Sequence, residues 1–130
     1  MTKGTSYDTR FLVELYYNSD SSEQFRMKQI LRSSKPNYLS TIALSEIYKL
    51  TLEKEGKGVA ELRARSIAKD FHIVNVDQEI AIEAAIIKHK SKMPLADSII
   101  ASTARILGIP CYTDDPHFDS IEGVAVKWIK

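Results

Sequence analysis

Two acidic residues lie on helical faces that otherwise carry apolar or small side chains. Glu46 shares its helical face with Ile42, Ala43 and Leu50, and Asp97 shares its face with Ile100, Ala101 and Ala104. An ionised carboxylate in apolar surroundings is costly unless it is paired, protonated or bound to a cation. The spacing suggests no obvious Arg or Lys partner for both acids. A bound cation is therefore one way to explain their positions.

Two further acids, Asp8 and Asp115, come just after short runs typical of β-strands. If these strands run parallel in one sheet, their carboxyl ends share an edge where ligands commonly bind. Should Glu46 and Asp97 reach the same place, four like charges would repel, and a divalent cation is the simplest remedy. Carboxylate oxygens with waters suit Mg²⁺ or Mn²⁺, whereas the Cys and His spacing of a zinc site is absent.

The elements that must position these acids alternate between strand and helix. Runs typical of strands cover 5–7, 38–40, 72–76 and 109–113, and a last apolar run covers 124–129. Helical patterns lie between them, with Gly56 and Gly58 as an interruption, Asp77 as an N-cap, Pro94 in a first turn and Gly108 after a last turn. This order favours an α/β fold with parallel strands and helices on both faces of the sheet.

The composition excludes several classes of protein. The 130 residues are 44% hydrophobic and 27% charged, which is ordinary for a globular domain and argues against disorder. A formal net charge of +1 provides no general attraction for nucleic acid. Residues 1–7 do not form a signal peptide, and no run approaches the ~20 apolar residues of a membrane span. With the lone Cys111, this predicts one cytoplasmic domain over residues 1–130 and no membrane segment.

Four short motifs then occur in an order that resembles the PIN-domain ribonucleases, and among them the VapC-type toxins of toxin–antitoxin systems. They are Tyr-Asp-Thr at 7–9, Leu-Ser-Glu at 44–46, Leu-Ala-Asp-Ser-Ile-Ile-Ala at 95–101 and Thr-Asp-Asp-Pro-His-Phe at 113–118. No single motif is specific, but the ordered set spans most of the chain. The resemblance implies a three-layer α/β/α fold with a central, mainly parallel sheet of about five strands.

The resemblance also implies a metal-dependent ribonuclease with Mg²⁺ or Mn²⁺ in an acidic pocket. The residues that match the family's catalytic and metal-binding acids are Asp8, Glu46, Asp97 and Asp115. Asp115 takes the acidic position of a Thr-x-Asp-x-x-Phe pattern, in which Asp114 is the variable residue. Thr113 resembles a hydroxyl that lies near the metal site. We therefore expect Thr113 and Asp114 to support the four acids.

The resemblance implies three partners: an RNA substrate, an antitoxin that blocks the acidic groove, and a second copy of the chain in a homodimer. Arg10, Lys49 and Lys92 are candidates to hold RNA phosphates, although each is also explained as an ordinary surface charge. We assign His117 to loop or core packing.

Each acid also has a purely structural explanation. Asp8 would cap the helix that begins at Thr9, Asp97 would favour a helix N-terminus, Glu46 would reach solvent through its methylenes, and Asp115 would serve only the Asp-Asp-Pro turn. Two alternatives for the whole protein stay open as well. One is a non-catalytic module that binds protein or RNA, and the other is a nuclease for RNA processing or DNA cleavage outside toxin–antitoxin systems.

Overall fold

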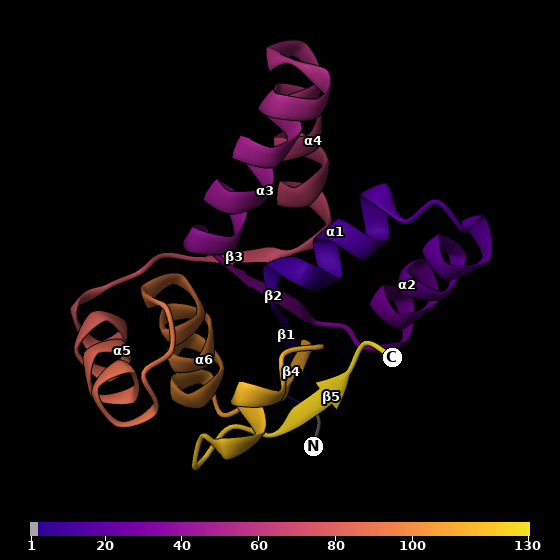
Figure 1. The fold of residues 1–130 in the computed structure, drawn as a ribbon. Coiled ribbons are helices and arrows are strands. Elements are labelled where there is room, and N and C mark those ends of the chain that lie inside the picture. Colours follow the sequence, from indigo (N-terminus) through magenta and orange to yellow (C-terminus); the bar gives the residue numbers. More distant parts are fainter. Residues whose placement is uncertain (1–2) are drawn as a thin grey trace.

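A five-stranded sheet forms the centre of the computed structural model, which describes residues 3–130 (Figure 1). Its strands are β1 (Thr5–Tyr7), β2 (Asn37–Ser40), β3 (His72–Val74), β4 (Cys111–Thr113) and β5 (Val126–Trp128). They lie in the order β3-β2-β1-β4-β5, and every neighbouring pair is parallel. Residues 1–2 lie outside the described residues. They belong to the segment 1–7, for which the sequence predicts no signal peptide.

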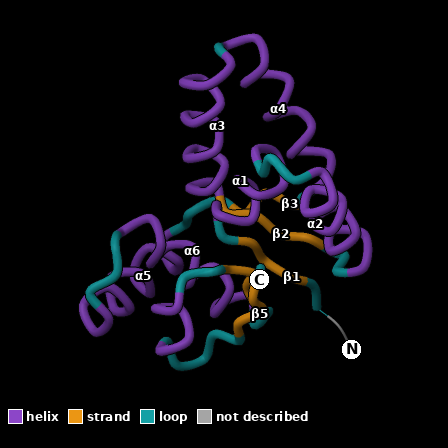
Figure 2. The backbone as a smooth tube through the Cα atoms, turned by 45° about the vertical axis from the view of Figure 1, so that its right-hand side comes forward, coloured by secondary structure: helices purple, strands orange, loops and turns teal. Residues whose placement is uncertain are grey.

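Six α-helices and one short 3-10 helix surround the sheet. They are α1 (Thr9–Tyr17), α2 (Ser21–Ser33), α3 (Thr41–Glu55), α4 (Lys57–Asp70), α5 (Gln78–Ser91), α6 (Leu95–Leu107) and η1 (Pro116–Ser120). The α5–α6 pair lies on one side of the sheet and α1 to α4 lie on the other (Figures 1 and 2). The predicted three-layer α/β/α fold with a parallel sheet is thus confirmed. Within residues 3–130, no helix has the length and apolar character needed to cross a membrane.

The ends of several elements follow the local sequence. The Asp77 side chain accepts a hydrogen bond from the Ile80 amide at 2.9 Å, which confirms the predicted N-cap. Gly108 ends α6 with a positive φ of 67°, a conformation that glycine adopts without strain. Pro94 is the N-cap residue of α6, just before its first turn.

Three predicted boundaries differ from the structure. Gly56 alone separates α3 from α4, with a φ of 86°, whereas Gly58 lies inside α4. The strand predicted over 72–76 ends at Val74, because the chain must reach the cap of α5 only three residues later. The strand predicted over 109–113 begins at Cys111, directly after Pro110, which has no N–H to donate to a neighbouring strand.

The core holds the helices that carry the acids against the middle strands. Phe11 and Leu12 of α1, Ile47 of α3 and Ile100 of α6 are fully or almost fully buried in one cluster. The buried Tyr7 of β1 contributes its ring to the same cluster, and its hydroxyl donates a hydrogen bond of 2.6 Å to Asn37 of β2. Burial of these apolar side chains fixes the beginnings of α1, α3 and α6 at the carboxyl edge of the sheet.

Candidate active site

Asp8 and Thr113 lie side by side at the carboxyl edge of the two central strands. Asp8 follows β1 and Thr113 ends β4, which pairs with β1 in parallel. The Thr113 hydroxyl donates a hydrogen bond of 2.8 Å to Oδ2 of Asp8. Asp8 is only 2% exposed, and its side chain makes no capping hydrogen bond to α1. Asp8 thus occupies the N-cap position of α1 without the side-chain bond that would explain it as a cap.

The environment of Asp8 disfavours its charged form. Burial is the main cause that raises the pKa of Asp8 to about 6; the nearby Asp97 carboxylate acts in the same direction, and the hydrogen bond from Thr113 opposes both effects. With this pKa, the Asp8 carboxylate is mostly charged at neutral pH, although its protein surroundings do little to stabilise that charge. Such a carboxylate is suited to binding a cation.

Asp97 lies in the first turn of α6 and is half-buried. Burial is the main cause of its raised pKa, followed by the charges of Asp115 and Glu46. Because Asp97 also acts on Asp8, it is electrically coupled to all three of the other acids. The structure thus brings the four predicted acids into one electrostatic neighbourhood.

Glu46 projects from the second turn of α3 and is held by a residue that the sequence analysis did not single out. The Thr9 hydroxyl donates a hydrogen bond of 2.5 Å to Oε1 of Glu46. This bond joins the start of α1 to α3 and directs Oε1 toward the residue that follows Asp8. The only available signal for Thr9 was its position directly after a strand-end aspartate.

Asp115 has a structural task as well as a place near Asp97. It is the N-cap of η1, and its Oδ1 accepts a hydrogen bond of 3.0 Å from the His117 amide. Burial opposes ionisation of Asp115, but the bonds from the His117 amide and ring outweigh it and lower the pKa. Of the two packing roles predicted for His117, the core role is excluded, because its ring is exposed; the ring instead lies 2.8 Å from Oδ1 of Asp115 within the loop after β4. The Asp-x-His spacing was its only sequence signal.

The cations near the acids are largely engaged with other carboxylates. Arg10 forms an ion pair with Asp114, and its charge also acts on Asp8 and Asp115. Lys49 pairs with Glu53 at 3.4 Å. In the described part of the chain Lys92 makes no ion pair. Arg10 therefore partly offsets the acidic charge, which the sequence did not indicate.

The donor set suits a hard divalent cation, but the acids do not form a closed cage. Among residues 3–130, no group of three or more His, Cys, Asp or Glu side chains is arranged to hold a metal ion. Mg²⁺ usually keeps several waters and is held by one or two protein carboxylates together with substrate phosphates. Asp8 and Asp97 fit that role by type, burial and mutual proximity. Coordination of one ion by all four acids stays a prediction.

Comparisons with solved structures show other proteins with a similar overall fold. A toxin–antitoxin complex from Klebsiella pneumoniae contains a chain that is 28% identical, with a TM-score of 0.75 over 93% of this chain and 95% of that chain. DNA-bound VapBC from Salmonella typhimurium is 16% identical, with a TM-score of 0.79 and 98% of each chain covered. VapC20 from Mycobacterium tuberculosis, a sarcin–ricin loop cleaving toxin, is 22% identical, with a TM-score of 0.74 over 95% of this chain and 98% of that chain.

At the level of sequence, no curated protein matches this chain significantly. The family model of the PIN domain matches residues 7–124, a span that contains all four acids. The resemblance noted from the short motifs is therefore confirmed, and this protein belongs to the PIN domain family.

Proposed function

We propose that this protein is an endoribonuclease that hydrolyses RNA phosphodiester bonds with Mg²⁺ or Mn²⁺, and that residues 1–130 form one nuclease domain. The carrying observation is the state of Asp8: it is buried, it has the Thr113 hydroxyl as a partner, and its pKa is raised to about 6. Membership of the PIN domain family and the cleaving activity named for the VapC20 structure support the proposal.

The four acids have different roles in this proposal. Asp8 and Asp97 hold the cation, and the Thr113 hydroxyl fixes the orientation of the Asp8 carboxylate. Glu46, held by Thr9, orients the attacking water and accepts its proton. When bound, Mg²⁺ or Mn²⁺ polarises the phosphate and stabilises the charge that develops on it. Asp115 supports the site through its cap of η1 and its charge near Asp97.

The reaction balances as a simple hydrolysis. The oxygen of water forms a bond to phosphorus, and the bond from phosphorus to the leaving ribose oxygen breaks. One water proton goes to Glu46, and the leaving oxygen takes up a proton from solvent.

We further propose that the protein is the cytoplasmic toxin of a toxin–antitoxin pair. The chain that is 28% identical comes from a toxin–antitoxin complex, and the other compared structures include VapBC assemblies. The antitoxin would act by covering the acidic groove. Co-expression with a candidate antitoxin, followed by co-purification and a cleavage assay, tests this partner directly.

A homodimer is supported by an apolar surface on the α5–α6 side. Ile82 and Ile86 lie one turn apart on α5 and are 56% and 42% exposed, and Leu95 at the start of α6 is 58% exposed. Exposed large apolar side chains one turn apart on a helix, such as Ile82 and Ile86, favour a contact surface. We propose that this surface pairs with its copy in a second chain.

Cleavage of a labelled RNA by the full chain tests the nuclease proposal. Hydrolysis should require Mg²⁺ or Mn²⁺, stop with EDTA and be lost in Asp97→Asn. Asp119→Asn is the matched control, because Asp119 is an exposed aspartate of η1. Cleavage that survives both EDTA and Asp97→Asn would refute the proposal.

A non-catalytic binding module is the second candidate. The observation that favours it is the lack, within residues 3–130, of a cluster of three or more side chains arranged to hold a metal ion. Such a module would gain no stability from metal, whereas a ligand that binds only the folded state raises the melting temperature. A thermal melt with and without saturating Mn²⁺ separates the two candidates.

A further inference from the structure

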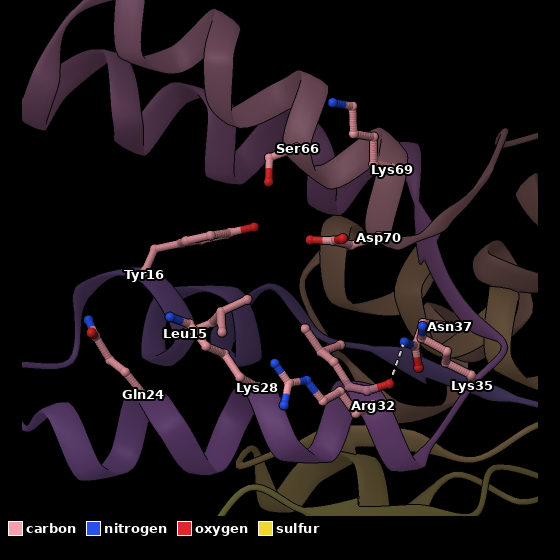
Figure 3. A pocket seen from close by; sticks show the side chains of 11 residues that line it. Leu15, Tyr16, Gln24, Lys28, Arg32, Lys35, Asn37, Ser66, Lys69 and Asp70 are labelled. Atoms are coloured by element: carbon pink, nitrogen blue, oxygen red, sulfur yellow. Dashed lines mark hydrogen bonds between the residues drawn. The ribbon is translucent and has the colours of Figure 1, made fainter.

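A second feature with binding character lies away from the acidic site. A cavity of about 530 Å³ lies between α1, α2 and α4. Asn37, the first residue of β2, lines it, so the cavity lies toward the amino edge of the sheet. The four acids lie at the opposite, carboxyl edge. Figure 3 shows α2 on one side of the cavity, and Ser66 and Asp70 of α4 facing it from the other.

The cavity concentrates positive charge. Lys28, Arg32, Lys35 and Lys69 line it together with one acid, Asp70. Four cations and one anion give a formal charge of +3, although the whole chain carries only +1. None of these five side chains forms an ion pair with another residue in the described range 3–130. A hollow with a local excess of one charge raises the concentration of ligands of the opposite charge.

A buried hydroxyl in the same cavity has no partner. The Tyr16 hydroxyl is fully buried and finds no hydrogen-bond partner among residues 3–130. It points across the cavity toward Ser66 and Asp70 (Figure 3). The Arg63 guanidinium lies 4.5 Å from the centre of the Tyr16 ring and holds that ring in place. Because buried polar groups are nearly always satisfied, this unpaired hydroxyl is an exception in the wall of the cavity.

We propose that this cavity is a binding site for phosphate groups. A net charge of +3 calls for a ligand with more than one negative charge, and the cavity is large enough for two linked phosphates. Arg32 offers a planar fork of donors that matches phosphate oxygens, and Lys28 lies one turn away on α2. The phosphates belong either to a free diphosphate or to the backbone of an RNA strand. The RNA source rests on the proposed nuclease function, whereas the free source does not.

Binding of pyrophosphate to the full chain, measured by calorimetry in EDTA, tests the site. The double variant Lys28→Gln/Arg32→Gln should weaken binding about tenfold or more, because it removes two charged donors. The matched control is Arg65→Gln/Lys90→Gln, which removes the same charge from exposed positions outside the cavity. Asp70→Asn should strengthen binding, since it removes the one opposing charge. Circular dichroism checks that each variant is folded.

Anisotropy of a labelled single-stranded RNA, also in EDTA, identifies the source of the phosphates. If the Lys28/Arg32 variant weakens RNA binding more than the control does, the cavity holds the RNA backbone. If only pyrophosphate binding is weakened, the ligand is a free phosphate compound. If pyrophosphate and RNA each bind the Lys28/Arg32 variant as tightly as the control variant, the proposal is overturned. EDTA prevents cleavage, so an inactive nuclease would leave these results unchanged.

Discussion

The Thr113 hydroxyl joins two parts of the site that are far apart in sequence. It donates to Oδ2 of Asp8 at 2.8 Å, across a separation of 105 residues, and it accepts a hydrogen bond of 3.0 Å from the Asp115 amide. Thr113 is completely buried. One hydroxyl therefore orients the strand-end carboxylate and also fixes the start of the loop that carries Asp115.

Thr113→Val should damage both stability and activity. The substitution leaves the buried Asp8 carboxylate and the Asp115 amide without their partner, which costs about 1–3 kcal/mol in the free energy of unfolding. Cleavage at neutral pH should fall because Asp8 loses the bond that favours its charged form. Urea denaturation and the RNA cleavage assay measure the two effects. Thr113→Ser keeps the hydroxyl and is the control. Equal activity of the Val and Ser variants would contradict this role.

The stability of the metal-free protein should depend on the ionisation of Asp8. Its pKa is about 6 in the folded protein, against 3.8 for an ordinary aspartate. Between these values the folded chain holds a proton that the unfolded chain has released. The stabilisation of the folded protein by protonated Asp8 is therefore complete below about pH 4 and is lost as the pH rises through about 6. The expected decrease in the free energy of unfolding is about 3 kcal/mol.

The difference between wild type and Asp8→Asn isolates this effect from the other titrating groups. Urea denaturation in EDTA at pH 4, 5 and 7 should show the variant gaining stability relative to wild type as the pH rises. Asp119→Asn should follow the wild type at every pH. A constant difference between Asp8→Asn and wild type would show that the pKa of Asp8 is not raised.

Asp97 and Asp115 should differ in their importance for cleavage. Asp97→Asn removes a carboxylate that has no capping task and should lower kcat/KM roughly 100-fold or more. Asp115→Asn keeps the cap of η1 and removes only a supporting charge, so the loss should be about 10- to 100-fold. Steady-state cleavage of one RNA by the folded variants gives the ratio. A larger loss for Asp115→Asn would reverse these roles.

A charge placed in the apolar α5 surface should separate the homodimer. In Ile82→Lys/Ile86→Lys the two ammonium groups would face their copies, and their desolvation and repulsion oppose association. Light scattering after gel filtration should report the mass of one chain instead of two. Leu62→Lys is the control, since Leu62 on α4 is 63% exposed and lies away from this surface. Wild-type protein that already has the mass of one chain would refute the proposed dimer.

The sequence was sufficient to predict that Asp8 and Asp115 follow strands at one edge of the sheet. Alternating strand and helix patterns imply parallel pairing, and that pairing places residues after β1 and β4, such as Asp8 and Asp115, at a common edge. The apolar faces around Glu46 and Asp97 indicate the side that packs against the sheet. Ala43 and Ile100, each three residues from one of these acids, are buried and confirm the faces.

The contacts between side chains could not be predicted in the same way. The pair of Arg10 with Asp114 and the contact of His117 with Asp115 depend on the conformation of the loop after β4. Local spacing does not specify that conformation. The bond from Thr9 to Glu46 depends on how α1 crosses α3, which follows from packing of the whole core. The basic cavity likewise needs three separate helices, so no short motif could reveal it.

A crystal of the protein soaked in Mn²⁺ shows whether Asp8 and Asp97 bind the metal. We expect one anomalous peak at roughly 2.0–2.3 Å from carboxylate oxygens of both residues. The peak should vanish in Asp97→Asn crystals grown in the same form. A peak elsewhere, or no peak at saturating Mn²⁺, would contradict the claim that these acids form a metal-dependent nuclease site.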